Sequence, residues 1–345
     1  MKASLEDFLI YVSLLALIVA SLGFPALKYA FVSIELILFT VKVNKNFKKF
    51  VLILVFIFFL TGFIYFSTII FTLASLIYAV RISKMNATSF YFLVNLCVYV
   101  YCFVILYFAF SGYNPNNIIN ASRNHLAVPL IALGSLKLFL VSKFGFKPSM
   151  LSSSLITIVA VWSISRGSII SAALLLVISA YQLKSNGGFL KNIILPIFLA
   201  LFIYTNYSSL KKHMYSKSFS LVKFYDNRNS ISDDPRAEII NEYIKSTNVK
   251  SFLLGRRIET TAHNNYHNSY ISAHSMFGIS FLIFFVYFVV KLKFSVIYLA
   301  PLLVRSLSDT ILFFNGEFDF ILFVVILLCS KKPNAKADLL YSPSN

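Results

Sequence analysis

The sequence has few charged residues for its length, and this shortage restricts the class of protein. Charged residues make up 13% of its 345 residues, whereas a soluble protein carries roughly a quarter. Hydrophobic residues make up 58% and the mean hydropathy is +0.78, which is more apolar material than one globular core can bury. The charge-free run 51–80 exceeds the roughly 20 apolar residues that a bilayer span needs. An ordinary soluble protein is therefore excluded, and an integral membrane protein is indicated.

Acidic residues are the scarcer charge, with 13 Asp and Glu against 31 Lys and Arg, for a net charge of +18. The basic residues lie in short clusters between apolar runs, as cytoplasmic residues beside membrane spans do, and not on one face or tail. This distribution argues against nucleic acid as a partner. The clusters are Lys42 with Lys45, Lys48 and Lys49; Arg81 with Lys84; Lys143 with Lys147; Lys184 with Lys191; Lys291 with Lys293; and Lys331 with Lys332 and Lys336.

Cysteine is also scarce, and its placement suggests no chemistry. Cys97, Cys102 and Cys329 lie inside apolar runs, and no pair of them has the spacing of a metal site or lies where a disulfide could form. They are interpreted as small apolar fillers. No internal period of 20–50 residues occurs, which excludes a soluble repeat protein.

The apolar runs predict an all-α integral membrane protein with about 12 transmembrane helices and one large periplasmic loop. The expected spans lie near 8–23, 24–41, 50–65, 67–81, 89–111, 125–141, 149–164, 167–183, 190–206, 269–290, 294–313 and 318–330. With both termini inside, all six basic clusters fall on one side, which the positive-inside rule makes cytoplasmic. The run 51–80 is predicted as two short helices that turn near 61–67, since one helix would put the four-lysine loop outside.

One connection, residues 207–268, is far longer than the others and lies on the opposite side from the lysine clusters. It separates a first part with nine spans, 1–206, from a last part with three spans and a cytoplasmic tail, 269–345. Asp234 and Pro235 predict the start of a helix within it, as an N-cap and a first-turn proline. Its apolar positions could pack against the membrane domain; they are Ala237, Ile239, Ile240, Tyr243 and Ile244. A long loop with its own helix is uncommon unless it is functional, so we expect chemistry in it or just beneath it.

Histidines gather at the end of this loop. Three of the five in the chain, His263, His267 and His274, fall within twelve residues. Histidine is the side chain most able to exchange a proton near neutral pH. The i, i+4 spacing of His263 and His267 could hold zinc on a helix, but no Glu or Cys completes a ligand set nearby. Interfacial histidines beside aromatic anchors are the alternative that these residues leave open.

Three arginines lie toward the outer side, where the orientation rule depletes them. Arg166 is at a turn between two spans, Arg123 is at the outer mouth of another, and Arg305 is inside a span with Asp309 four residues later. A charge at membrane depth costs about 2.5–3.5 kcal/mol, so it usually faces the bundle interior. Guanidinium groups there suit a diphosphate. Snorkelling or structural pairing is the alternative for each, and pairing is favoured for Arg305. Glu35, deep in the first half, is expected to pair with a cation.

Several short motifs occur in order. They are Asn124-His125-Leu126-Ala127, Ser165-Arg166-Gly167, Arg236 in the loop helix, Leu254-Gly255, His267-Asn268-Ser269-Tyr270-Ile271, and Gly278 eleven residues after His267. Together they resemble the signature of the bacterial O-antigen polymerase and O-antigen ligase superfamily, over about two thirds of the chain. Two positions depart from that pattern, since Phe281 and Arg256 stand where further glycines are common.

The resemblance implies a metal-independent, inverting glycosyl transfer at the periplasmic face of the bacterial inner membrane, without a cofactor. The substrate would be an oligosaccharide linked to undecaprenyl diphosphate, and a chain-length regulator protein is a further implied partner beside the lipid bilayer. By motif, His267 would deprotonate or orient the acceptor hydroxyl, and Arg166 would neutralise charge on the departing diphosphate. The residues implied to bind the diphosphate or the sugar, or to support His267, are Arg123, Arg305, Arg236, Asn268 and Tyr270.

Three alternatives stand beside the polymerase reading. A ligase, which transfers polymer to the lipid A core, shares the fold and motifs, but the size of the chain and the lack of extra soluble segments favour a polymerase. A lipid-linked oligosaccharide flippase would place charges at the midplane of several helices and show internal repeats. Metal-dependent membrane glycosyltransferases need carboxylates in an early outer loop, and residues 21–25 contain none.

Overall fold

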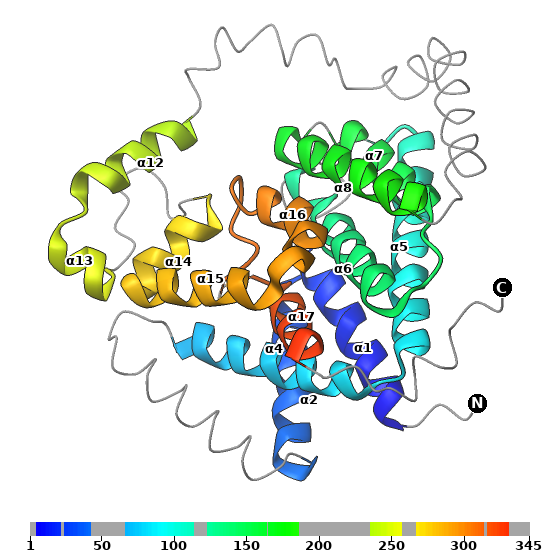
Figure 1. Ribbon diagram of the computed structural model, residues 1–345, viewed down its shortest axis with the longest axis horizontal. Coiled ribbons are helices and arrows are strands. Elements are labelled where there is room, and N and C mark those ends of the chain that lie inside the picture. The colour runs from blue at the N-terminus through cyan, green and yellow to red at the C-terminus, as the bar shows by residue number, and fades with distance from the viewer. Residues whose placement is uncertain are drawn as a thin grey trace, which may run out of the picture.

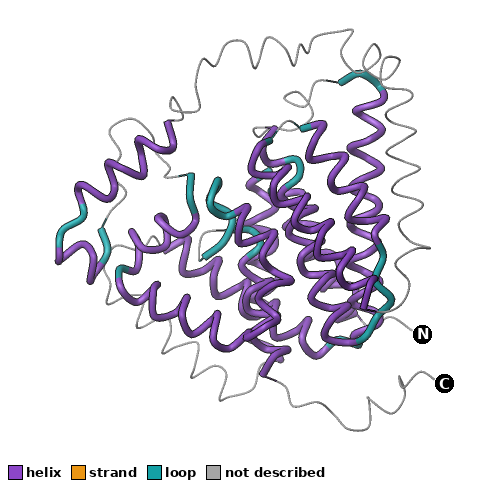
Figure 2. Tube along the Cα trace, turned by 45° about the horizontal axis from the view of Figure 1, so that its top comes forward, coloured by secondary structure: helices purple, strands orange, loops and turns teal. Residues whose placement is uncertain are grey.

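The computed structural model describes residues 5–21, 24–42, 66–113, 123–163, 165–185, 235–256, 267–313 and 316–330. Within these ranges every regular element is a helix and none is a strand (Figures 1 and 2). In chain order the helices are α1 Leu5–Ala20, α2 Pro25–Lys42, α4 Phe66–Lys84, α5 Ala87–Phe110, η2 Arg123–His125, α6 Val128–Phe144, α7 Met150–Trp162, α8 Arg166–Ser185, α12 Pro235–Ser246, α13 Val249–Leu254, α14 Ser269–Phe277, α15 Ile279–Leu292, η4 Lys293–Ser295, α16 Val296–Arg305 and α17 Asp319–Ser330.

Most of the predicted spans correspond to single helices in the predicted order. These helices are α1, α2, α4, α5, α6, α7, α8 and α17, and each agrees with its apolar run to within a few residues. The spans expected near 50–65 and 190–206, residues 61–65 of the expected turn and the Asp234 cap lie outside the described residues. The predicted start of the loop helix is confirmed, because α12 begins at Pro235.

Two predicted spans are wrong as continuous helices. The run 269–290 divides into α14 and α15 at Gly278, whose φ of 54° and ψ of −138° are not helical. The run 294–313 is helical only to Arg305, and residues 306–313 form turns and bends. Ser308, Asp309 and Thr310 favour this break, since short polar side chains bond to nearby backbone and compete with helical hydrogen bonds.

Among the described residues, three helices are long and apolar enough to cross a membrane. They are Ala87–Phe110, Arg166–Lys184 and the nearly continuous stretch Ile279–Arg305, which joins α15, η4 and α16. α5 and α15 turn large apolar side chains outward. Those of α5 include Phe92, Leu96, Val100, Phe103 and Tyr107, and those of α15 include Ile283, Val286, Tyr287 and Val290. Contiguous apolar surface of this extent is uncommon on proteins that face water on all sides.

α6 is the central helix of the bundle. It contacts α5, α7, α8, α16 and α17, and every residue from Val128 to Val141 is buried. A helix that is apolar around its whole circumference is buried on all sides, which explains this central place. Lys137, within the buried part of α6, is itself buried, and its Nζ donates to Ser152 Oγ at 2.7 Å.

The lysine-rich helix ends meet at one end of the bundle. Cys329, near the end of α17, lies close to the Ser295 side chain and within electrostatic range of Lys143 and Lys291. Lys143 is in the last turn of α6 and Lys291 is in the last turn of α15. Because α16 begins beside Ser295 and ends at Arg305, Arg305 lies at the opposite end of the bundle.

The buried acid Glu35 is paired, as expected from the sequence. Arg81 Nη1 on α4 lies 2.6 Å from Glu35 Oε1 on α2, and Ser13 Oγ on α1 donates to the same oxygen at 2.8 Å. Both charged side chains are buried. This ion pair and the Ser13 hydrogen bond therefore join three helices of the first half.

α13 is held against the corner between α14 and α15 by two glycines. A Cβ atom on Gly255 (φ 82°) would lie 2.6 Å from Ser275 O, and one on Gly278 would strike the Leu253 carbonyl. Two hydrogen bonds also join the segments, since the Arg256 backbone N donates to Ser275 O at 2.6 Å and the Ser275 side-chain Oγ donates to Arg256 O at 3.0 Å. We refer to this contact between Leu253–Arg256 and Ser275–Gly278 as the glycine clasp.

We predict that Gly278→Ala opens the glycine clasp. The added methyl group would meet the backbone of α13, and a non-glycine residue at a strained φ costs about 1–3 kcal/mol by itself. Gly145→Ala is the control, because Gly145 also has a positive φ (69°) but a Cβ there meets no atom within 4 Å. Hydrogen exchange of residues 249–256 should rise in Gly278→Ala and stay at the wild-type level in Gly145→Ala. Equal exchange in the two variants would contradict the clasp.

Candidate functional site

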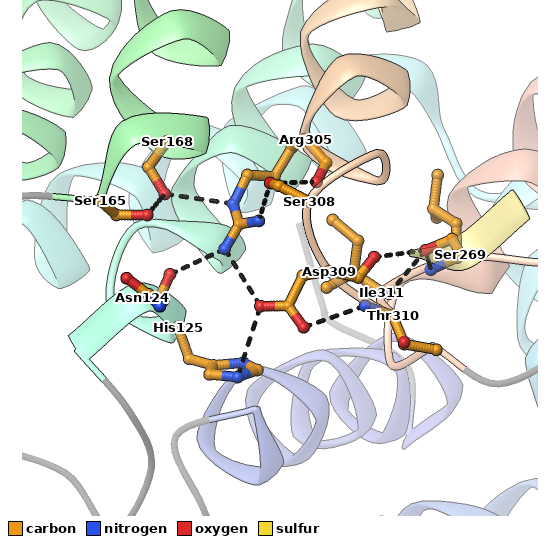
Figure 3. Close-up of polar contacts among 11 residues, drawn as sticks. Asn124, His125, Ser165, Ser168, Ser269, Arg305, Ser308, Asp309, Thr310 and Ile311 are labelled. Carbon is orange, nitrogen blue, oxygen red and sulfur yellow. Dashed lines mark hydrogen bonds and ion pairs between the residues drawn. The ribbon is translucent and has the colours of Figure 1, made fainter. Parts of the chain in front are cut away.

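The guanidinium of Arg305 is the centre of a polar cluster at the end of the bundle opposite the lysines. Its side chain is 1% exposed. Nε donates to Ser168 Oγ at 3.2 Å, Nη1 donates to Ser308 Oγ at 2.6 Å, and Nη2 donates to Asn124 O at 3.0 Å (Figure 3). Nη2 also lies 3.3 Å from Asp309 Oδ2, which confirms the i, i+4 pair expected from the sequence. One side chain thus joins η2, α8 and the end of α16.

The start of α8 approaches this cluster closely. Ser168 Oγ donates to Ser165 Oγ at 3.0 Å, and a Cβ atom on Gly167 would strike the Ser308 side chain. A glycine at 167 therefore lets α8 touch the turn that follows α16. Arg166 is the first residue of α8, and its side chain is exposed beside this contact.

η2 supplies a histidine that the sequence alone does not indicate as a site residue. His125 Nε2 lies 3.6 Å from Asp309 Oδ2, and the two side chains point toward each other (Figure 3). The side chain of His125 is about one third exposed (33%), whereas that of Asp309 is buried at 6%. In the sequence His125 stands out only as part of the Asn124-His125-Leu126-Ala127 motif, and no spacing relates it to Asp309, 184 residues later.

The turn after α16 is bonded to the start of α14. Ser269 N donates to Ser306 O at 2.9 Å and Asn268 Nδ2 donates to Leu307 O at 3.0 Å. Ser269 Oγ donates to Asp309 O at 2.7 Å and accepts bonds from the backbone N–H groups of Ile311 and Leu312. Asn268 and Ser269 therefore satisfy five backbone groups of the segment where α16 has ended.

Asn268 and Tyr270 have structural partners. Asn268 is the N-cap of α14 and accepts bonds from the N–H groups of Tyr270 and Ile271 at 2.9 and 3.1 Å. The Tyr270 hydroxyl donates to Leu303 O at 3.0 Å, and its ring packs on Phe285 and Phe313. Tyr270 therefore holds α14 to α16, and Asn268 holds it to the turn that follows α16.

His267 directly precedes this cap, and its side chain is partly exposed. Its φ of 50° is uncommon for a residue with a side chain and places it at a sharp turn. Gly167, the neighbour of Arg166, lies against Ser308 of the turn after α16. Asn268, the neighbour of His267, is bonded to Leu307 of the same turn. The structure thus brings the two motifs to the same end of the same turn.

The other predicted residues are only partly described. The backbone of Arg123 begins η2 and Arg236 is the second residue of α12, but their side chains lie outside what the structure describes. His263 also lies outside the described residues. Among the described side chains, no group of three or more His, Cys, Asp or Glu gathers that could hold a metal ion.

α12 packs on α14, next to the site. Ile239 and Tyr243 are buried against Ile271, as predicted, but Ile244 is exposed, so the prediction for that residue was wrong. The hydroxyl of Tyr243 is 2.5 Å from Nδ1 of His274, and Arg256 lies over the Tyr243 ring at 4.3 Å.

His274 is held in a setting that favours its neutral form. α14 lies outside the three helices that are long enough to cross a membrane. Burial lowers the pKa of His274, the Phe252 backbone opposes this shift, and the charge of Arg256 adds to it. Neutral His274 can therefore take part in the Tyr243 hydrogen bond as donor or acceptor.

Comparison of the chain with known protein families, curated proteins and solved structures finds no match. The resemblance to the O-antigen polymerase and ligase superfamily therefore rests on the motif residues alone.

We predict that Arg305 and Asp309 are strongly coupled in stability. Arg305→Met removes the buried cation and leaves the Asp309 carboxylate beside unpaired polar groups. This should lower the free energy of unfolding by about 3–5 kcal/mol. Asp309→Asn should cost less in that background than in the wild type, because residues in one network couple by about 0.5–3 kcal/mol. Unfolding of the detergent-solubilised protein, followed by the fluorescence of Trp162, measures both effects. Additive losses in the double variant would contradict a shared network.

Proposed function

We propose that this protein is an O-antigen polymerase, a glycosyltransferase of the bacterial inner membrane. It would transfer an oligosaccharide chain from undecaprenyl diphosphate onto a lipid-linked repeat unit at the periplasmic face. The proposal includes about 12 spans, with both termini in the cytoplasm and the loop 207–268 in the periplasm. The separation of the lysine-rich helix ends from the Arg305 end supports this orientation under the positive-inside rule.

The observation that carries the proposal is the meeting of three separate motifs at the turn 306–309. Asn124 and His125 come from η2, Gly167 and Ser168 from α8, and Asn268 and Ser269 from the start of α14. These are the motifs on which the family resemblance was based, and they are distant in the sequence. A shared active site is a physical reason for their meeting.

Arg166 is the best placed cation for the leaving diphosphate. Its side chain is exposed at the N-terminus of α8, where the helix dipole and the unsatisfied N–H groups of the first turn already favour an anion. A cation at this end of a helix is unfavourable unless an anion binds. Arg305 differs, because its guanidinium is already bonded to four protein oxygens. We therefore assign Arg305 to positioning η2 and α8 rather than to direct contact with the substrate.

His267 would accept the proton of the acceptor hydroxyl. The acceptor oxygen would form the new bond to the anomeric carbon from the face opposite the diphosphate, with inversion, and the bond from that carbon to the diphosphate would break. The bonding electron pair would leave with undecaprenyl diphosphate, whose charge Arg166 would stabilise. General base catalysis of this kind contributes about 10²–10⁴-fold to a rate.

We predict that His267→Ala and Arg166→Ala abolish long-chain polymer. Each variant would be expressed in a polymerase-deficient host that supplies matched repeat units, and lipopolysaccharide would be read by gel. The expected result is a ladder for the wild type and a core with a single repeat for both variants. Lys184→Ala is the matched control for Arg166, because it is an exposed cation at the other end of the same helix.

The remaining outcomes separate the alternatives. Normal ladders from His267→Ala and Arg166→Ala, with membrane insertion verified, would overturn the site assignment. Failure of the wild type to make chains here, with rescue of a ligase-deficient host that makes its own polymer, would identify a ligase instead.

A further inference from the structure

The two helices of the described part of the loop differ in what they turn outward. α12 exposes Glu238, Asn241, Glu242 and Lys245 and buries Ile239 and Tyr243, as an amphipathic helix beside water does. α13, in contrast, turns apolar side chains outward. Its Val249, Phe252, Leu253 and Leu254 are 76%, 40%, 43% and 54% exposed, and none of its residues is buried.

α13 is nevertheless a well-defined helix in a fixed place. It has a reciprocal capping box, in which Asn248 Oδ1 accepts from Ser251 N at 2.8 Å and Ser251 Oγ accepts from Asn248 N at 2.9 Å. Its C-terminal end is held by the glycine clasp. Because the backbone is held at both ends, the outward apolar side chains are a stable surface of the protein.

This surface continues onto a helix that is apolar and outward-facing along its length. α13 contacts α14 and α15, and the first exposed large apolar residues of α15 are Ile279 and Leu282. Further along α15 the outward face continues with Ile283, Val286 and Val290, within a stretch long enough to cross a membrane. α13 therefore lies beside the first turns of a candidate span, at the end opposite Lys291.

We propose that α13 is an interfacial anchor whose apolar side chains enter the outer lipid leaflet beside α15. Phe252, Leu253 and Leu254 would be immersed, and exposed Lys250 would meet phosphate groups of the lipids. The proposal rests on the membrane setting of the proposed function, but not on the polymerase activity. Lipid is favoured over a second copy of the chain because the surface is one short helix, continuous with the lipid-facing side of α15.

The anchor would set the height of the catalytic histidine. The glycine clasp joins α13 to the C-terminal end of α14, and Asn268 caps the other end directly after His267. α14 has nine residues, so His267 lies about 13 Å from the clasp along a single rigid helix. A lipid-linked acceptor also enters from the outer leaflet, so anchor and substrate would be aligned by the same surface.

Tryptophan fluorescence in lipid nanodiscs tests this placement without any assay of activity. In a Trp162→Phe background, which removes the single native tryptophan, Phe252→Trp would be compared with Asn241→Trp on the polar face of α12 and Val286→Trp on α15. Two sets of brominated phospholipids would serve as quenchers. Shallow bromines lie near the carbonyl end of the acyl chains, and deep bromines lie near the methyl end. A tryptophan about 5–10 Å into the boundary between headgroups and acyl chains should be quenched best by the shallow bromines.

We expect shallow bromines to quench Phe252→Trp strongly, several-fold more than Asn241→Trp. Val286→Trp should be quenched by deep bromines as well as by shallow ones. Quenching of Phe252→Trp no greater than that of Asn241→Trp would overturn the anchor. A photo-crosslinking amino acid at position 252 gives a second readout. A mass gain of one phospholipid supports the proposal, and a covalent dimer of the chain would assign the surface to a second copy and overturn it. If Val286→Trp is also unquenched, the membrane setting itself fails, which separates that failure from loss of the anchor alone.

Discussion

A single buried guanidinium organises the end of the bundle that carries the candidate site. The planar guanidinium of Arg305 donates to four oxygens on three segments: Ser168 of α8, Asn124 of η2, and Ser308 and Asp309 of the turn after α16. A buried charge is tolerated only with good partners, and removing one partner typically costs about 3–5 kcal/mol. The positions of α8 and η2 are therefore coupled to Arg305, and through them the position of Arg166 is coupled as well.

The site lies where regular structure is interrupted. α16 ends at Arg305 although the chain continues, His267 has a positive φ, and Gly278 separates α14 from α15. Each interruption exposes backbone groups that are costly to bury without partners. Asn268, Ser269 and Ser275 satisfy many of these groups through hydrogen bonds to neighbouring segments. Local irregularity of this kind, supported by the surroundings, is common where proteins carry out chemistry.

Sequence reasoning succeeded where a local pattern has a single physical outcome. The apolar runs gave most helices, Pro235 marked the start of α12, and the i, i+4 spacing anticipated the ion pair of Arg305 and Asp309. It failed at the breaks after Arg305 and at Gly278, because an apolar run predicts burial or lipid contact but not where hydrogen bonds leave the helix. It also missed His125, whose partner Asp309 is remote in the chain.

The sequence by itself determined the all-helical class, the apolar surfaces suited to lipid, and the residue types that gather near the loop, because these depend on composition and short-range periodicity. Only the tertiary structure decided which of those residues meet. It assigned Arg81 to Glu35, brought the Ser165-Arg166-Gly167 and His267-Asn268 motifs to one turn, and packed Gly255 against Gly278. The physical reason is that such contacts depend on how helices pack, and packing is set by the shapes of side chains on several segments at once.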